Sequence, residues 1–518
     1  MVTAEHRSPR SAAAGVVATA VYFGSAEFIA SALRSSGAPL LVLGQTIIPA
    51  VPTPLIKAAI AVFGTHDKLA LVITILIVGV MVGGLIGWFN ADSQSSALVL
   101  FAGLGLLPVV LVLISGGSAT DVLPGLGGVI LGIGIYVGLT HLGGGRRSVG
   151  DAGEQPPARP DRRLFLTLAG LCAALGVAGV ALGRSAAVLA RSAAGALTNL
   201  VLPAPATSAP EVPAGAELRV PGLAPLITGN DDFYRIDTLL VPPVVDASAW
   251  SLRIHGMVER EVRISMAELL ELPLEEHRVS LTCVSNPVGG DLVGTAKWLG
   301  YPVRELLARA RPTADADMVL SHSDDGFTAS TPLEVLSDDR AALVVVGMND
   351  ASLPREHGFP ARLVVPGLYG YVSATKWVTE LEVTRFADKQ AYWTRRGWSS
   401  HGPVLVASRI DVPRAGARIS AGDGGGVVIA GMAWAQHTGI EKVEVRIDNG
   451  DWQSAQLSEE LTVDIWRQWR HEFAGVGPGT HTATVRATDR RGKVQISARR
   501  PAIPGSATGL HDRQFSVE

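Results

Sequence analysis

The sequence is poor in cysteine and in charge. Two cysteines, Cys172 and Cys283, occur among 518 residues, and only Cys283 follows residue 221, so a disulfide framework in that part of the chain is excluded. No Cys-x-x-Cys-His pattern and no cluster of cysteines is present, which leaves no site for a c-type haem or an iron–sulfur cluster. Charged residues make up only 18% of the chain, and the net charge of −3 gives no indication of a nucleic-acid partner.

Hydrophobic residues, in contrast, are abundant. They make up 47% of the chain, and the mean hydropathy of +0.30 is high for a soluble protein of this length. The excess lies before about Gly183, whereas the sequence after Pro221 has the charge density of a globular protein. A helix needs about 20 apolar residues to cross a bilayer. We therefore predict a transmembrane bundle of about five helices over residues 1–183, with spans at 12–33, 69–89, 97–114, 122–142 and 164–183.

Two features of this apolar part leave alternatives open. Glu27 belongs either to a functional site inside the membrane or to the end of a helix, from which its carboxylate reaches the interface. Residues 39–63 are apolar but contain four prolines, and repeated prolines break a helix. For this segment we predict an extended or re-entrant connection followed by a short interfacial helix.

The arginines predict the orientation in the membrane. Arg7 and Arg10 precede the first span, and five more arginines lie between the fourth and fifth, which predicts a cytoplasmic N-terminus and an extracytoplasmic chain after Gly183 at the plasma membrane. The pair Arg162-Arg163 before a weakly hydrophobic helix resembles a twin-arginine export signal. The alternative is an ordinary basic stop on the cytoplasmic side. Residues 184–221, rich in Ala, Pro, Ser and Thr, are predicted to be a linker.

Beyond the linker, short apolar strands alternate with short helices. Residues 251–258 have the alternation of a strand, and residues 265–272 begin with Ser265 and carry Glu268 three residues later, the pattern of a helix with a capping box. Residues 303–310 predict another helix, while 342–348 and 361–365 are compact apolar strands. This mixture predicts an α+β domain over residues 222–401.

The stretch around Cys283 carries the strongest functional signal. An apolar strand ends in Thr282-Cys283, a turn with Asn286 and two glycines follows, and Lys297-Trp298 comes next. Matching segments lie in order at residues 230–235, 250–256, 348–362 and 366–377. This ordered set resembles the sulfite oxidase family of molybdopterin-dependent oxidoreductases over about residues 228–413, and we identify the chain as a membrane-anchored, actinobacterial-type member.

The resemblance implies a molybdenum–molybdopterin cofactor with Cys283 as its metal ligand and catalytic residue. A thiolate is a soft ligand suited to such a metal. The cofactor tail carries phosphate, which is bound by cations and backbone N–H groups. The positions that match cofactor-binding residues of the family are Tyr234, Arg235, Asn286, His357, Arg362 and Lys376.

Each of these positions also has an ordinary structural interpretation. The resemblance implies phosphate contacts for Arg235, Arg362 and Lys376, a place beside the pterin or phosphate for His357, and hydrogen bonds to cofactor edges for Tyr234 and Asn286. Taken singly, His357 would be a turn histidine, Arg362 and Lys376 surface charges, and Cys283 a small core residue. Only the ordered set favours the functional interpretation.

One departure from the family concerns the substrate. Sulfite oxidases carry arginines in the turn after the ligand cysteine, whereas here no basic residue follows Cys283 until Lys297. A pocket specific for sulfite is therefore not implied. Arg395, Arg396 and His401 are candidates either for substrate contacts or for covering a domain junction.

From about Gly402 the pattern is all-β. Residues 443–447 and 483–487 alternate between apolar and polar, with turn residues between them, which predicts an immunoglobulin-like sandwich over residues 402–518. In the family this domain forms a dimer contact, so a homodimer is a reasonable expectation.

Two functions of different classes are consistent with the sequence. The first is a membrane-anchored oxidoreductase that transfers an oxygen atom to or from a small oxyanion or sulfur compound. This enzyme would exchange electrons with a separate cytochrome or quinone-linked protein. The second is an anchored binding or scaffold protein with a degenerate cofactor domain, against which the retained Cys283 motif argues.

Overall fold

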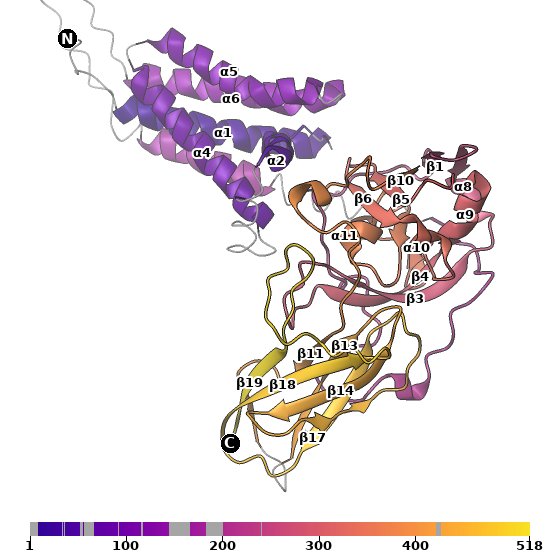
Figure 1. Cartoon of the computed structure of the whole chain (residues 1–518). Helices are drawn as coiled ribbons and strands as arrows, with labels where there is room; N and C mark the ends of the chain where they lie inside the picture. The colour runs from indigo at the N-terminus through magenta and orange to yellow at the C-terminus, as the bar shows by residue number, and fades with distance from the viewer. Residues whose placement is uncertain are drawn as a thin grey trace, which may run out of the picture. The chain divides into compact units, whose positions relative to one another are not determined.

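The computed structural model describes residues 9–33, 35, 37–51, 55, 67–91, 93–114, 118–143, 166–182, 200–239, 241–420 and 426–518. The chain divides into two compact units, residues 1–197 and 198–518. The first unit consists of helices, and the second combines an α+β part with an all-β part (Figure 1). This is the predicted fold class.

The first unit is a helix bundle. Its helices are α1 (Pro9–Leu33), α2 (Pro39–Ala50), α4 (Asp67–Phe89), α5 (Gln94–Ile114), α6 (Ala119–Gly143) and a helix over Leu166–Leu182. Among the described residues, four helices are long and apolar enough to cross a membrane, namely Pro9–Leu33, Lys68–Phe89, Gln94–Ile114 and Ala119–His141. The fifth predicted span is a shorter apolar helix, and Arg162-Arg163 lie outside the described residues.

Glycines allow close packing around α1. An added Cβ at Gly15 would lie 2.2 Å from the carbonyl oxygen of Gly83 in α4. An added Cβ at Gly24 would lie 2.1 Å from the carbonyl oxygen of Gly176 in the helix Leu166–Leu182. Backbone therefore meets backbone at both contacts, as is usual where small residues let membrane helices approach.

The prediction of an extended connection after residue 39 is wrong for Pro39–Ala50, which forms α2. Pro39 occupies the start of the helix, where its missing N–H has no intrahelical partner to lose. The Glu27 side chain is buried and accepts a hydrogen bond from the backbone N–H of Leu40 at 3.2 Å. Glu27 thus caps the first turn of α2 from within the bundle.

An antiparallel sheet and a mixed sheet form the α+β part of the second unit. The first has the order β3-β4-β7-β8, with β9 on β7, and contains β3 (Glu275–Thr282), β4 (Val293–Pro302), β7 (Leu343–Met348), β8 (Ala351–Ser352) and β9 (Arg362–Val364). The second has the order β2-β1-β10-β5-β6 and contains β1 (Ser251–Gly256), β2 (Val262–Ser265), β5 (Met318–Ser323), β6 (Thr328–Pro332) and β10 (Val378–Thr384).

Short helices connect these strands. They are α8 (Met266–Leu270), α9 (Val303–Ala310), α10 (Leu333–Ser337) and α11 (Gly370–Ser373), with single 3-10 turns at Ala214–Ala216, Arg355–His357 and Thr394–Arg396. The predicted capping box is confirmed at α8, where the Ser265 hydroxyl accepts from the Glu268 N–H and the Glu268 carboxylate accepts from the Ser265 N–H. The predicted helix over residues 303–310 is also confirmed.

Two further sheets form the all-β part. One has the order β11-β13-β17-β16, from β11 (Ala407–Val412), β13 (Val427–Trp434), β16 (Gln456–Leu457) and β17 (Arg467–Phe473). The other has the order β12-β19-β18-β14-β15, from β12 (Ala417–Ile419), β14 (Ile440–Ile447), β15 (Gln453–Ser454), β18 (Gly479–Asp489) and β19 (His511–Val517). A separate apolar core, centred on Trp469 and Phe515, lies between them.

Candidate active site

Cys283 directly follows β3, at the end of a strand whose last four residues are buried. Its side chain is 8% exposed, and burial raises the pKa of the thiol. The sulfur accepts a hydrogen bond from the Ser285 N–H at 3.4 Å, a contact that favours the thiolate. An isolated thiol here is therefore neutral, and a bound cation is the means of keeping it deprotonated.

The turn after Cys283 is held by its own polar groups. The Cys283 N–H donates to the carbonyl of Leu292, and the Asn286 N–H donates to the carbonyl of Cys283. The Asn286 side-chain oxygen accepts from the Leu292 N–H at 3.0 Å, so this amide fixes the turn. Gly289 has a φ of +77°, a conformation that glycine adopts without a steric penalty.

The all-β part supports the same strand and turn. The Ser280 N–H donates to the carbonyl of Asp464, and the Ser280 hydroxyl accepts from the Trp466 N–H at 2.9 Å. The Gln436 side-chain nitrogen donates to the Thr282 hydroxyl at 2.8 Å. Cys283 is consequently positioned by residues that follow it by more than 150 positions in the chain.

Tyr234 lies close enough to Arg362 and to Cys283 for the charge of each to shift its pKa. Burial raises the pKa of Tyr234, the Cys283 thiolate raises it further, and Arg362 opposes both effects. The Arg362 side chain is buried at 5% exposure and lies over the Trp298 ring. It donates to three backbone carbonyls and forms no ion pair with a carboxylate of the described residues. Burial accordingly lowers the pKa of Arg362 to about 10.

His357, Lys376 and Arg235 complete a cationic cluster around Arg362. The Lys376 side chain is 11% exposed, bonds Asp237 at 2.9 Å and the carbonyl of Glu356 at 3.1 Å, and has its pKa lowered to about 8 by partial burial. Arg235 donates to the same Asp237 carboxylate. His357 bonds the carbonyl of Asn230, and its pKa falls to about 4 through burial and the neighbouring cations. Of the three cations in this cluster, Arg235 and Lys376 bond the Asp237 carboxylate, whereas Arg362 has no carboxylate partner among the described residues, an excess of positive charge that suits a bound anion.

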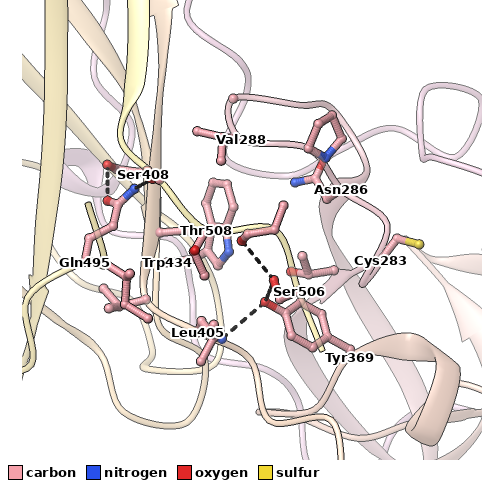
Figure 2. Close-up of a pocket in the computed structure, with 18 of the residues that line it drawn as sticks. Cys283, Asn286, Val288, Tyr369, Leu405, Ser408, Trp434, Gln495, Ser506 and Thr508 are labelled. Atoms are coloured by element: carbon pink, nitrogen blue, oxygen red, sulfur yellow. Dashed lines mark hydrogen bonds between the residues drawn. The ribbon is translucent and has the colours of Figure 1, made fainter. Parts of the chain in front are cut away.

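Residues of the Cys283 turn also line a pocket (Figure 2). Its walls are formed by residues 282–283 and 286–289, Tyr369, residues 405–408, Trp434, Lys493, residues 495–496 and residues 506–509. The space open to water-sized molecules is about 40 Å³, enough for a small substrate group. The hydroxyl of Tyr369 bonds Ser506 at 2.7 Å and accepts from the Leu405 N–H, as the dashed lines show.

The structure thus brings Cys283 together with Tyr234, Arg362 and the cluster around them, whereas other candidates lie elsewhere. Lys297 pairs with Glu276 and Asp350. Arg396 lies 3.6 Å over the Tyr392 ring, and His401 stacks on Phe386, so neither lines the pocket. Arg395 does not line it either.

Sequence reasoning missed the residues that reach the Cys283 turn from elsewhere. Tyr369 stands in the segment between Pro366-Gly367 and Lys376-Trp377 that carried the family resemblance, so that segment held a usable signal. Arg409, Lys493 and His511 lie in the all-β part. There, the alternation of apolar and polar residues does not indicate which side chains face the Cys283 turn.

This unit therefore contains a buried strand-end thiol, basic side chains around the buried Arg362 and a small pocket, groups that suit a metal cofactor carrying phosphate. Residues 239–393 match the model of the oxidoreductase molybdopterin binding domain family. Over this region the chain resembles the sulfite oxidase family of molybdopterin-dependent oxidoreductases.

Several curated relatives and one solved structure are similar to the chain. The mitochondrial sulfite oxidase of Rattus norvegicus is 28% identical over 292 residues, which cover 47% of this chain and 52% of that protein. The protein-methionine-sulfoxide reductase catalytic subunit of Campylobacter jejuni is 31% identical over 199 residues, covering 34% of this chain and 63% of that protein. The sulfane dehydrogenase SoxCD of Paracoccus pantotrophus aligns with a TM-score of 0.47 at 22% identity, over 54% of this chain and 80% of that one. The chain spans about half the length of the curated sulfite oxidases it matches.

Proposed function

We propose that the protein is a membrane-anchored molybdenum-cofactor oxidoreductase that transfers an oxygen atom to or from a small oxyanion or sulfur compound. The observation that carries the proposal is Arg362, a buried cation without a carboxylate partner among the described residues, linked through Tyr234 to the buried Cys283 thiol. Burying a lone charge is costly, and a phosphate group at this position removes that cost.

The donor set fits a molybdopterin cofactor. Cys283 would ligate the metal, and Arg362, Lys376 and Arg235 would bind the phosphate, with His357 neutral beside it because its pKa is about 4. When bound, the metal centre supplies two-electron oxygen-atom transfer. Tyr234 stays protonated, since burial raises its pKa, and its hydroxyl is available to donate to a cofactor edge. Asn286 contributes by fixing the ligand turn.

The pocket beside Cys283 is the proposed substrate site. Its small volume suits an oxyanion or a sulfoxide group and excludes a folded partner. Tyr369 is buried at 3% exposure, and burial raises its pKa, so its hydroxyl remains a donor at neutral pH. The sulfite oxidases and the methionine sulfoxide reductase subunit found among the relatives favour this class of substrate.

The apolar helices favour a location at the plasma membrane, with residues 222–518 outside the cytoplasm. The twin-arginine pair at 162–163 would export the folded unit with its cofactor, across the linker 184–221. Residues 402–518 are proposed to be immunoglobulin-like and to form a homodimer contact. Electrons would pass to or from a separate cytochrome or quinone-linked protein.

Metal analysis of the purified full-length protein tests the proposal. We expect about one molybdenum and one pterin per chain, and a changed molybdenum spectrum with loss of turnover in Cys283→Ser. Cys172→Ser, which alters the other cysteine in the helix Leu166–Leu182, is the matched control and should behave like wild type. Protein without molybdenum or pterin, from a host able to insert the cofactor, would favour the alternative of an anchored binding or scaffold protein.

A further inference from the structure

The pocket beside Cys283 contains a single charged side chain. Its lining consists of apolar groups, hydroxyls and amides, and the exception is Lys493. No arginine and no carboxylate stands among the lining residues, although Arg409, Arg499 and Arg513 lie close by. Arg409 pairs with Asp411, Arg499 pairs with Asp512, and Arg513 donates to the carbonyl of Ile410.

Lys493 is exposed and forms no ion pair with a carboxylate of the described residues. Its backbone is nonetheless fixed. The Lys493 N–H donates to the Asp489 carboxylate at 2.9 Å, and the Lys493 carbonyl accepts from the Asp489 N–H at 3.1 Å. The backbone turn that carries Lys493 at the pocket is therefore held by hydrogen bonds, and its side chain forms no ion pair among the described residues.

The adjoining wall is also rigid. Gln495 is buried and uses its whole side-chain amide: its oxygen accepts from the Ser408 hydroxyl at 2.6 Å and from the Ala487 N–H, and its nitrogen donates to the carbonyl of Gly509. These bonds join the segments that carry Lys493, Ser408 and Gly509, which all line the pocket. The backbone position from which Lys493 extends is consequently fixed relative to the other walls of the pocket.

We infer that Lys493 is a specificity-determining residue that recruits an anionic substrate into the pocket beside Cys283. This inference deepens the proposed function and rests on it for the identity of the pocket. An unpaired cation over a narrow, otherwise uncharged pocket attracts anions and repels cations, and its effect is strongest at low salt. Lys493 thus supplies from the all-β part the positive charge that the turn after Cys283 lacks.

Calorimetric titration of the full-length holoprotein in detergent with sodium sulfate tests the inference at low ionic strength. Sulfate should bind wild type, and Lys493→Met should weaken the affinity about fivefold, the upper end for a solvent-accessible ion pair. Lys493→Arg should retain most of the affinity. Arg491→Met is the matched control, because Arg491 is an exposed cation two residues away that does not line the pocket, and it should bind like wild type.

A neutral ligand of similar shape separates recognition from structural damage. The affinity for dimethyl sulfone should be the same in wild type and Lys493→Met. Equal sulfate affinity in wild type and Lys493→Met, or no sulfate binding at all, overturns the inference, as does an equal loss for both ligands. Molybdenum is measured on the same samples: metal-free protein that still binds sulfate through Lys493 supports the anion site and overturns the proposed enzyme.

Discussion

The guanidinium of Arg409 in β11 donates a hydrogen bond to the carbonyl oxygen of Gly290, 3.1 Å away. Arg409 is only 8% exposed, pairs with Asp411 at 2.7 Å and lies over the Trp466 ring. A cation of the all-β part therefore binds the turn after Cys283, and the geometry of Cys283 depends on both parts of the unit.

Replacing Arg409 should destabilise residues 198–518. Arg409→Met removes the bond to Gly290 and leaves the partly buried Asp411 carboxylate without its ion-pair partner, which costs about 3 kcal/mol of unfolding free energy. Chemical denaturation followed by tryptophan fluorescence measures the change. The double variant Arg409→Met/Asp411→Asn should regain most of the loss, and a double variant as unstable as the single one would show that the unpaired charge is not the cause.

Arg362 should have opposite effects on the two forms of the protein. In cofactor-free protein Arg362→Met removes a buried charge that has no carboxylate partner, so the unfolding temperature should stay the same or rise. In the holoprotein it removes charge-assisted hydrogen bonds worth about 2–3 kcal/mol, so cofactor affinity should fall about 30- to 150-fold. Pterin content after dialysis measures the second effect. Arg253→Met, at an exposed pair with Glu261, should leave cofactor content unchanged.

Gly289 should tolerate no side chain, for two separable reasons. Its φ of +77° disfavours other residues, and an added Cβ would lie 2.2 Å from the ring of His511. Gly326 has a similar φ of +82° but open space around it. We expect Gly326→Ala to cost about 1 kcal/mol through backbone strain alone, and Gly289→Ala to cost clearly more and to lower molybdenum content. Equal costs in thermal unfolding would mean that the contact with His511 has no energetic weight.

His511 should make the stability depend on pH between about 4 and 6.5. Burial and the nearby arginines lower its pKa to about 4, from about 6.5 in the unfolded chain. Between these two pKa values the unfolded state binds the proton more readily than the folded state. The contribution of His511 to the unfolding free energy, about 3 kcal/mol, is therefore complete above pH 6.5 and is lost as pH falls towards 4.

His357 has a pKa of about 4 as well and adds to the same window. His511→Gln should therefore reduce the slope of unfolding free energy against pH by about half without abolishing it. Denaturation midpoints at half-unit pH steps give this slope. An unchanged slope in His511→Gln would contradict the assignment.

Local signals made much of the fold predictable. The Ser265 and Glu268 pair marked the start of α8 because a capping box is a contact within four residues. Cys283 and Arg362 were predictable through ordered motifs, and the structure places both near Tyr234. The helix α2 was missed because its prolines were taken to break it, whereas Pro39 opens it and Glu27, twelve residues before, caps it.

The contributions of the all-β part to the site were not predictable in this way. Arg409, Lys493 and His511 reach the Cys283 turn through contacts more than 100 residues apart in the chain. Strand alternation reports which face of a strand is buried, but not which distant turn it covers. Their roles depend on how the two parts of the unit pack, which no local pattern encodes.

The supports of the Cys283 turn also fix a temporal order. Arg409 bonds Gly290, Trp466 bonds Ser280, and His511 packs against Gly289. Cys283 therefore reaches its final geometry only after the ribosome has made more than 200 further residues. A nascent chain that ends before His511 contains Cys283 but lacks part of the set of residues that supports its turn, here called the cradle. Cofactor insertion therefore belongs to the period after synthesis of this unit, when one folding event completes both the cradle and the sheets that hold it.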